Sequence, residues 1–236
     1  MAEQLILSNG IIKATFSSKG AELVSVVKDG QEKIWIGDPE VWALHAPLLF
    51  PICGGLKDDK FIYEGKEYTL QKHGYIRFVE FEVESHSDTK LVFLHRWDNE
   101  TLSQFPFHYE LRVIYTLEGS SLKVDYNVKN LDETPMYYSV GAHEGYYCPE
   151  GIEEYSIIFD KAEDLDRSFL DGNLLECDPV NIGKNIRELP LKYEYFAIDA
   201  LVFLNLKSRK VSLKNRKTGE EVELEFEGYD FFLALD

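Results

Sequence analysis

The sequence predicts an all-β protein built from antiparallel sheets that pack as a sandwich. Several segments alternate apolar and polar residues with a period of two, which is the pattern of strands with one buried and one solvated face. Turn signals separate these segments at short intervals, as expected for hairpins. The clearest alternating segments are LKVDYNVKN at 122–130, VELEFEG at 222–228 and VEFEVES at 79–85.

Two further segments and four turns complete the predicted pattern. KLVFLHRW at 90–97 and YELRVIYTL at 109–117 are rich in the β-branched and aromatic residues that strands favour. Each predicted turn contains a glycine, and the four turns lie at 28–30, 64–66, 118–120 and 218–220. Consecutive strands joined in this way form antiparallel sheets.

Helices are expected at only two places. In DPEVWALHAPLLF, Asp38 is a potential N-cap, Pro39 fits the first helical position, and Pro47 ends the pattern. A short helical turn is expected near 164–167. Neither an internal repeat nor a Pro/Gly/Ser-rich linker divides the chain. We therefore expect a single domain over residues 1–236.

Composition excludes several classes of function. The 236 residues include 25 Lys and Arg against 42 Asp and Glu, so 25 − 42 gives a net charge of −17. That charge argues against binding to nucleic acid or to anionic membrane surfaces. No apolar run is long enough to span a bilayer, and the N-terminus does not read as a signal peptide. Cys53, Cys148 and Cys177 form no CxxC pair, which predicts free thiols in a reducing cytoplasm and no zinc site.

Two of the six histidines have unusual neighbours in the sequence. His73 lies in LQKHGYIRF, where Gly74 and the fixed cation Arg77 follow it. His143 lies in YYSVGAHEGYYCP between Gly141 and Gly145. Glycine permits a close approach of backbone or ligand, and the flanking tyrosines suit the C–H faces of a sugar ring. An equally weighted interpretation is that the glycines are structural and that the tyrosines fill a core. The other histidines are expected to be structural or solvated: His45, His86, His95 and His108.

Four segments, taken in order, carry a resemblance to a known family. They are LLFPICGGLKDDKFIYEGKEYTLQKHGYIRF, FPFHYELRVIYTLEGSSLKVDYNVKN, YYSVGAHEGYYCP and YFAIDALVF. Together they resemble the aldose 1-epimerase (galactose mutarotase-like) family, and its LacX-type branch in particular. The resemblance implies a β-supersandwich of large twisted antiparallel sheets with a sugar cleft.

The resemblance also implies a reaction and a set of residues. Members interconvert the α and β anomers of a free hexose by acid–base ring opening, without a cofactor or a metal. By resemblance, His143 is the general acid, His73 and Arg77 hold sugar hydroxyls, and Asp199 binds the sugar. A histidine that titrates near neutral pH suits the role of acid.

Three departures from the family pattern bear on activity. The family's base is a glutamate in a motif near the C-terminus, which this chain lacks, so we expect the last strands and the base to be missing. Gly55 stands where LacX-type relatives tend to carry an arginine, and Glu144 stands where a proline usually follows the acid. Because neighbouring strand residues face opposite sides, we expect Glu144 to point away from His143.

Three functions remain open on this basis. The chain is a mutarotase, a catalytically impaired carbohydrate-binding relative, or a β-sandwich interaction module whose histidines are structural. Missing terminal strands leave unpaired sheet edges. We therefore also expect either a homodimer across that edge or low stability.

Overall fold

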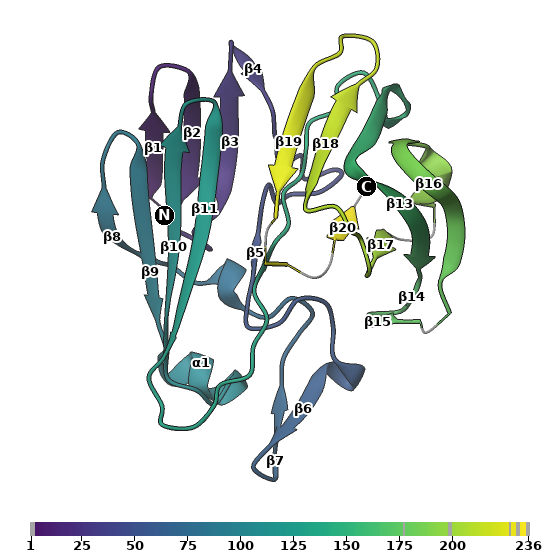
Figure 1. The fold of residues 1–236 in the computed structure, drawn as a ribbon. Coiled ribbons are helices and arrows are strands. Elements are labelled where there is room, and N and C mark those ends of the chain that lie inside the picture. Colours follow the sequence, from purple (N-terminus) through teal and green to yellow (C-terminus); the bar gives the residue numbers. More distant parts are fainter. Residues whose placement is uncertain (1–2, 177, 198–199, 227, 230–231, 235–236) are drawn as a thin grey trace. The chain divides into compact units, whose positions relative to one another are not determined.

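The structure, a computed structural model, describes residues 3–176, 178–197, 200–226, 228–229 and 232–234, and its regular structure is mainly β-strand (Figure 1). The chain divides into two compact units, an N-terminal unit (Met1–Tyr147) and a C-terminal unit (Cys148–Asp236), each with its own hydrophobic core. The single domain expected over 1–236 stays a prediction. In the described part of the chain, none of the helices is long and apolar enough to cross a membrane.

The N-terminal unit contains two four-stranded antiparallel sheets. Its elements are β1 (Gln4–Ser8), β2 (Ile12–Ser17), β3 (Leu23–Lys28), β4 (Gln31–Glu32), β5 (Leu48–Leu49), η1 (Lys57–Asp59), β6 (Lys60–Tyr63), β7 (Lys66–Thr69), η2 (Ile76–Phe78), β8 (Glu82–His86), β9 (Lys90–Arg96), α1 (Asn99–Gln104), β10 (Tyr109–Glu118), β11 (Ser121–Asn130) and β12 (Gly141–Ala142). One sheet has the order β1-β2-β3-β4 and the other the order β11-β10-β9-β8. β5 pairs with β12, and β6 pairs with β7.

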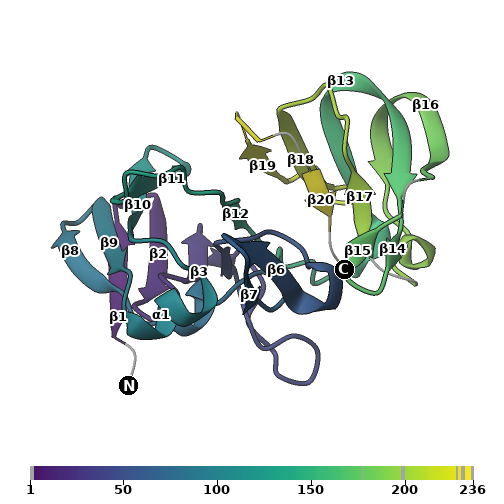
Figure 2. The ribbon, with the colours of Figure 1, turned by 90° about the horizontal axis from the view of Figure 1, so that it is seen from below.

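These two sheets pack face to face, as both ribbon views show (Figures 1 and 2). The rings of Phe16 in β2 and Tyr115 in β10 lie 4.5 Å apart between centroids, and both side chains belong to the buried core. The Tyr115 hydroxyl also donates a hydrogen bond of 2.9 Å to the carbonyl of Ala21. Along β10, buried residues alternate with less buried ones, which is the period-two pattern of a half-buried strand. The predicted antiparallel sandwich is thus confirmed within this unit.

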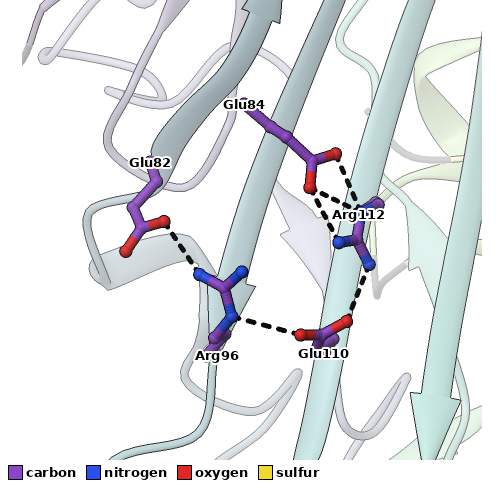
Figure 3. Close-up of polar contacts among 5 residues, drawn as sticks. All are labelled: Glu82, Glu84, Arg96, Glu110 and Arg112. Atoms are coloured by element: carbon purple, nitrogen blue, oxygen red, sulfur yellow. Dashed lines mark hydrogen bonds and ion pairs between the residues drawn. The ribbon is translucent and has the colours of Figure 1, made fainter.

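The outer face of β8, β9 and β10 carries a ladder of ion pairs (Figure 3). Arg112 bonds Glu84 at 2.7 Å and Glu110 at 2.9 Å. Arg96 bonds the same Glu110 at 3.1 Å and Glu82 at 2.9 Å. Hydrogen bonds from Arg112 lower the pKa of both Glu84 and Glu110. The ladder keeps this face polar, so the opposite face of the sheet is the one that packs.

The C-terminal unit is built around one mainly antiparallel sheet. Its elements are η3 (Ile152–Glu154), β13 (Tyr155–Ser168), β14 (Leu170–Asp171), β15 (Leu174–Leu175), β16 (Val180–Pro190), η4 (Tyr193–Tyr195), β17 (Leu201–Phe203), β18 (Lys210–Asn215), β19 (Glu221–Glu225) and β20 (Phe232–Ala234). The sheet order is β19-β18-β13-β17-β20, and β16 pairs with β13. The buried carboxylate of Glu163 accepts bonds of 2.6 Å from both the amide and the hydroxyl of Ser208.

The helix expected to begin at Asp38 and to end before Pro47 is wrong. The Asp38 carbonyl accepts a hydrogen bond of 2.7 Å from the Trp42 amide, which closes a single turn. The chain then leaves the helical path. The amides of His45 and Ala46 donate to the Glu22 carboxylate, at 2.8 and 3.2 Å. The Trp42 carbonyl accepts a hydrogen bond of 2.6 Å from the indole N–H of Trp35 instead of from a helical amide. Tertiary partners have therefore taken the groups that helical bonds would use.

Three other elements differ from expectation. The turn expected at 164–167 lies inside β13, and the strand expected from residue 79 begins only at Glu82. The helix α1 was not expected from the sequence. It begins with a capping box, in which Asp98 accepts from the Thr101 amide at 2.8 Å and Thr101 Oγ1 accepts from the Asp98 amide at 2.8 Å.

Candidate functional site

The backbone around His73 is fixed by two reciprocal hydrogen bonds. The His73 amide donates to the Gly54 carbonyl at 2.8 Å, and the Gly54 amide donates to His73 Nδ1 at 3.0 Å. His73 and Gly74 both have left-handed backbones, with φ of +67° and +68°. A Cβ on Gly74 would lie 2.2 Å from the Phe50 carbonyl oxygen, so only glycine fits there. Since Nδ1 accepts, the neutral His73 ring carries its proton on Nε2.

His143 follows β12 directly and lies against two aromatic rings. Its ring centroid is 5.9 Å from that of His73, with the two planes nearly perpendicular at 86°. The ring of Trp42 lies 5.0 Å away on a tilt of 35°. Gly145 leaves room for the Trp42 ring, because a Cβ there would lie 3.0 Å from Trp42 Cζ3 and 2.6 Å from Trp35 Cβ. The structure therefore brings together the two histidines that the sequence singled out.

Both imidazoles are poorer bases than a free histidine. Burial is the largest cause that lowers the pKa of His73 to about 4, and the charges of His143, Lys72 and Arg77 contribute to the same shift. Burial also lowers the pKa of His143, and the positive charges of Lys72 and Arg77 add to that effect. Both rings are therefore neutral at neutral pH.

Arg77 is held beside this pair by its own neighbours. Its guanidinium donates to the Lys72 carbonyl at 3.0 Å and lies 4.6 Å from the centre of the Phe78 ring. Desolvation lowers the Arg77 pKa. Within the described residues, the ion pairs of the structure involve neither Lys72 nor Arg77. The site is thus locally cationic in a strongly acidic protein.

The residues that flank His143 take different roles. Tyr137 is 71% exposed, and Tyr138 packs 5.7 Å from the Phe50 ring. Burial raises the pKa of Glu144, and the charge of Glu144 contributes to the raised pKa of the buried Tyr115 and of the half-buried Tyr146. Glu144 is not among the groups that shift the pKa of His143. The expectation that its carboxyl group faces away from that ring stays a prediction.

Asp199 lies outside the described residues. Sequence reasoning missed Trp42, Lys72 and Gly54 as neighbours of the pair. Lys72 precedes His73 directly and was open to inference, whereas the Trp42 and Gly54 contacts depend on tertiary folding. Across the described ranges, no group of three or more His, Cys, Asp and Glu is placed to hold a metal ion.

The arrangement provides a proton donor or acceptor, N–H donors and an aromatic face. The Nε2–H of His73 and the guanidinium of Arg77 can donate to oxygens. The Trp42 ring offers an apolar surface. Such a set suits an uncharged or anionic ligand that is rich in oxygen atoms.

Comparison with known proteins supports one family. The sequence profile of the aldose 1-epimerase family matches residues 3–228. The plasmid-encoded Protein LacX of Lactococcus lactis subsp. lactis is 36% identical over 237 residues, which cover 94% of this chain and 79% of that protein. Its chromosomal counterpart matches to the same extent.

Solved structures agree with that assignment. A galactose mutarotase related enzyme from Lactobacillus acidophilus has a TM-score of 0.93 at 32% identity, covering 98% of this chain and 79% of that one. A galactose mutarotase-like protein from Lactobacillus casei has a TM-score of 0.90 at 28% identity, covering 98% and 82%. The expected galactose mutarotase-like all-β fold is confirmed, and this chain belongs to the aldose 1-epimerase family.

Proposed function

We propose that this protein interconverts the α and β anomers of a free hexose, with His143 as the general acid. The observation that carries the proposal is the close pairing of the His143 and His73 rings, 5.9 Å apart, beside two cations. Family membership supports a mutarotase-like function and a sugar as the substrate.

In the proposed reaction, His143 gives a proton to the ring oxygen while a base removes the proton of the anomeric hydroxyl. The C1–O5 bond breaks as the aldehyde forms, and C1 rotates about the C1–C2 bond. The ring closes on the other face of C1 when both protons return. His73 and Arg77 donate hydrogen bonds to sugar hydroxyls and hold the ring during opening.

Asp199 is proposed as a further sugar-binding residue, on the resemblance of AIDALVF to the family motif. We expect Asp199→Ala to weaken hexose binding measured by calorimetric titration. An unchanged dissociation constant would remove Asp199 from the site.

One observation favours a second candidate, a sugar-binding relative without turnover. Mutarotation needs a base as well as an acid. Among the described residues, the charges that shift the pKa of His143 and His73 are cationic groups, with no carboxylate. Such a protein would use the same histidines to bind an aldose without opening its ring.

Anomer exchange separates the candidates. Starting from pure α-D-galactose and α-D-glucose, exchange is followed by polarimetry and NMR for the wild type, His143→Ala and the control His86→Ala. Acceleration that disappears only in His143→Ala supports the enzyme. Sugar binding without acceleration supports the second candidate. Neither binding nor acceleration, with a folded protein, contradicts both and leaves an interaction module.

We also propose that the protein acts in the reducing cytoplasm. Cys53 and Cys148 are free thiols in the structure, in agreement with the composition. Alkylation of the protein extracted from cells under acid quench tests this proposal. Thiols blocked by oxidation in the cell would contradict it.

A further inference from the structure

A second site is indicated by a cavity of about 440 Å³ in the N-terminal unit, which neither His73 nor His143 lines. Its walls come from the segment between β7 and β8, from the end of β9, and from α1 with its cap. A volume of this size is typical of sites for small molecules.

The charged groups of this cavity all have one sign. Glu80, Asp98 and Glu100 line it, and no lysine or arginine does so among the residues that the structure describes. A wall of three carboxylates repels anions and attracts cations. Tyr75 and Phe78 add aromatic surface, and Phe78 is 48% exposed. Aromatic faces favour the alkyl and charged parts of organic cations.

The exposed carboxylates of Glu80 and Asp98 retain acceptor capacity. Glu80 Oε2 accepts from the Ser18 hydroxyl at 2.9 Å, and Asp98 Oδ1 accepts from the Thr101 amide at 2.8 Å. Each of these bonds uses one oxygen of the carboxylate and leaves the second for a ligand. The cavity is therefore rich in acceptors, which a ligand with several N–H donors would satisfy.

A buried imidazole completes the wall. His95 lines the cavity with only 7% of its surface exposed, and its Nδ1 lies 3.1 Å from the Tyr109 hydroxyl. That hydroxyl lies 3.2 Å from the hydroxyl of Tyr75. Burial lowers the pKa of His95 to about 4, so the ring does not repel a cation at neutral pH. Because both hydroxyls can reverse the direction of donation, His95 Nε2 is able to accept an N–H bond.

The geometry points to a binding site for a small organic cation, an amine or guanidine, between α1 and the segment at 71–80. The carboxylates of Glu80, Asp98 and Glu100 take up the N–H donors, and Phe78 covers the hydrocarbon part. The same segment carries His73 and Arg77.

A charge series of matched chain length tests this site. 1,4-Diaminobutane, 1,4-butanediol and succinate are each titrated into the ¹⁵N-labelled chain, and backbone amide shifts are followed by NMR. We expect saturable shifts with the diamine at Gln71, Tyr75, Thr101 and Gln104, and none with the diol or succinate. The absence of a saturable shift with the diamine, equal binding of the diol, or shifts confined to other regions would overturn the proposal.

Three variants test the assignment of the charges. Glu80→Gln combined with Glu100→Gln keeps side-chain volume and the acceptor for Ser18, and we expect it to weaken diamine binding by about tenfold or more. Glu100→Gln alone, at an exposed helix position, is expected to give a smaller loss in the same direction and covers the event that the double variant misfolds. Glu118→Gln, in a distant turn, is the control. Unchanged affinity in both cavity variants would refute the site.

Discussion

His73 and His143 are neutral because their rings are buried and face cations rather than carboxylates. Burial is the largest cause for both rings, and Lys72 adds to it by its charge. Removing that charge should therefore raise the pKa of both rings. We predict that Lys72→Gln raises each pKa by up to about one pH unit. Ring Cε1–H shifts followed by NMR over a pH series provide the measurement.

The matched control is Lys129→Gln, which removes an exposed lysine from the end of β11. It should leave both histidine titrations unchanged. If Lys72→Gln behaves like this control, the charge of Lys72 does not contribute to the lowered pKa values of the two histidines. The sign matters for the proposed reaction, because a general acid acts only while its proton is present, and the lowered pKa of His143 restricts that form to more acidic pH than in a free histidine.

His95 links protonation to stability. Its pKa is about 4 in the folded protein and 6.5 for the free side chain, so between these values the unfolded chain binds the additional proton. The stability associated with the neutral buried ring is present above pH 6.5 and decreases as the pH falls toward 4. This linkage amounts to at most about 3 kcal/mol.

We predict that His95→Gln has a flatter dependence of unfolding free energy on pH than the wild type over that interval. Urea denaturation at several pH values measures it, and His86→Gln at an exposed position serves as the control. Identical slopes for His95→Gln and the wild type would show that the ring is not held neutral by burial.

At the scale of elements, the apolar–polar alternation in the sequence predicted the strands better than the capping and proline signals predicted the helices. The alternation in 109–117 and 122–130 predicts β10 and β11, because the pleating of a strand alone decides which face each side chain points to. The helix expected between Asp38 and Pro47 is wrong because the carboxylate of Glu22, 16 residues upstream of Asp38, accepts hydrogen bonds from two backbone amides of that segment. Such a distant partner leaves no local signal.

The helix α1 shows the reverse case, since the sequence carries a local signal for its start. Asp98 and Thr101 have the spacing of a capping box, and the helix they begin has only six residues. We predict that Asp98→Ala lowers the free energy of unfolding by about 1 kcal/mol, whereas Asp98→Asn, which can still cap, changes it by much less. Chemical denaturation compares the two. Equal losses in both variants would mean that charge rather than capping matters.

At the scale of the molecule, the family motifs located part of the candidate site. His73, Arg77 and His143 lie in motifs far apart in the chain, and the structure places the two histidine rings together in one unit. Asp199 lies outside the described residues, so its role remains a proposal. The contacts of His143 with Trp42 and of His73 with Gly54 depend on packing that no local pattern encodes.

The single domain proposed for 1–236 has a thermodynamic test. The two units have separate cores, yet a single domain should unfold cooperatively. We predict one calorimetric transition whose van't Hoff and calorimetric enthalpies agree. Two separable transitions would show that the units are independent domains. Sedimentation of the same sample tests the homodimer expected from the sequence.

The most direct test of the sugar site is an NMR titration of the histidine rings with D-galactose and D-glucose. The account predicts that the ring signals of His73 and His143 shift together and saturably with at least one hexose, while those of His86 stay unchanged. Histidine signals that do not respond to either sugar, in a folded protein, would contradict it.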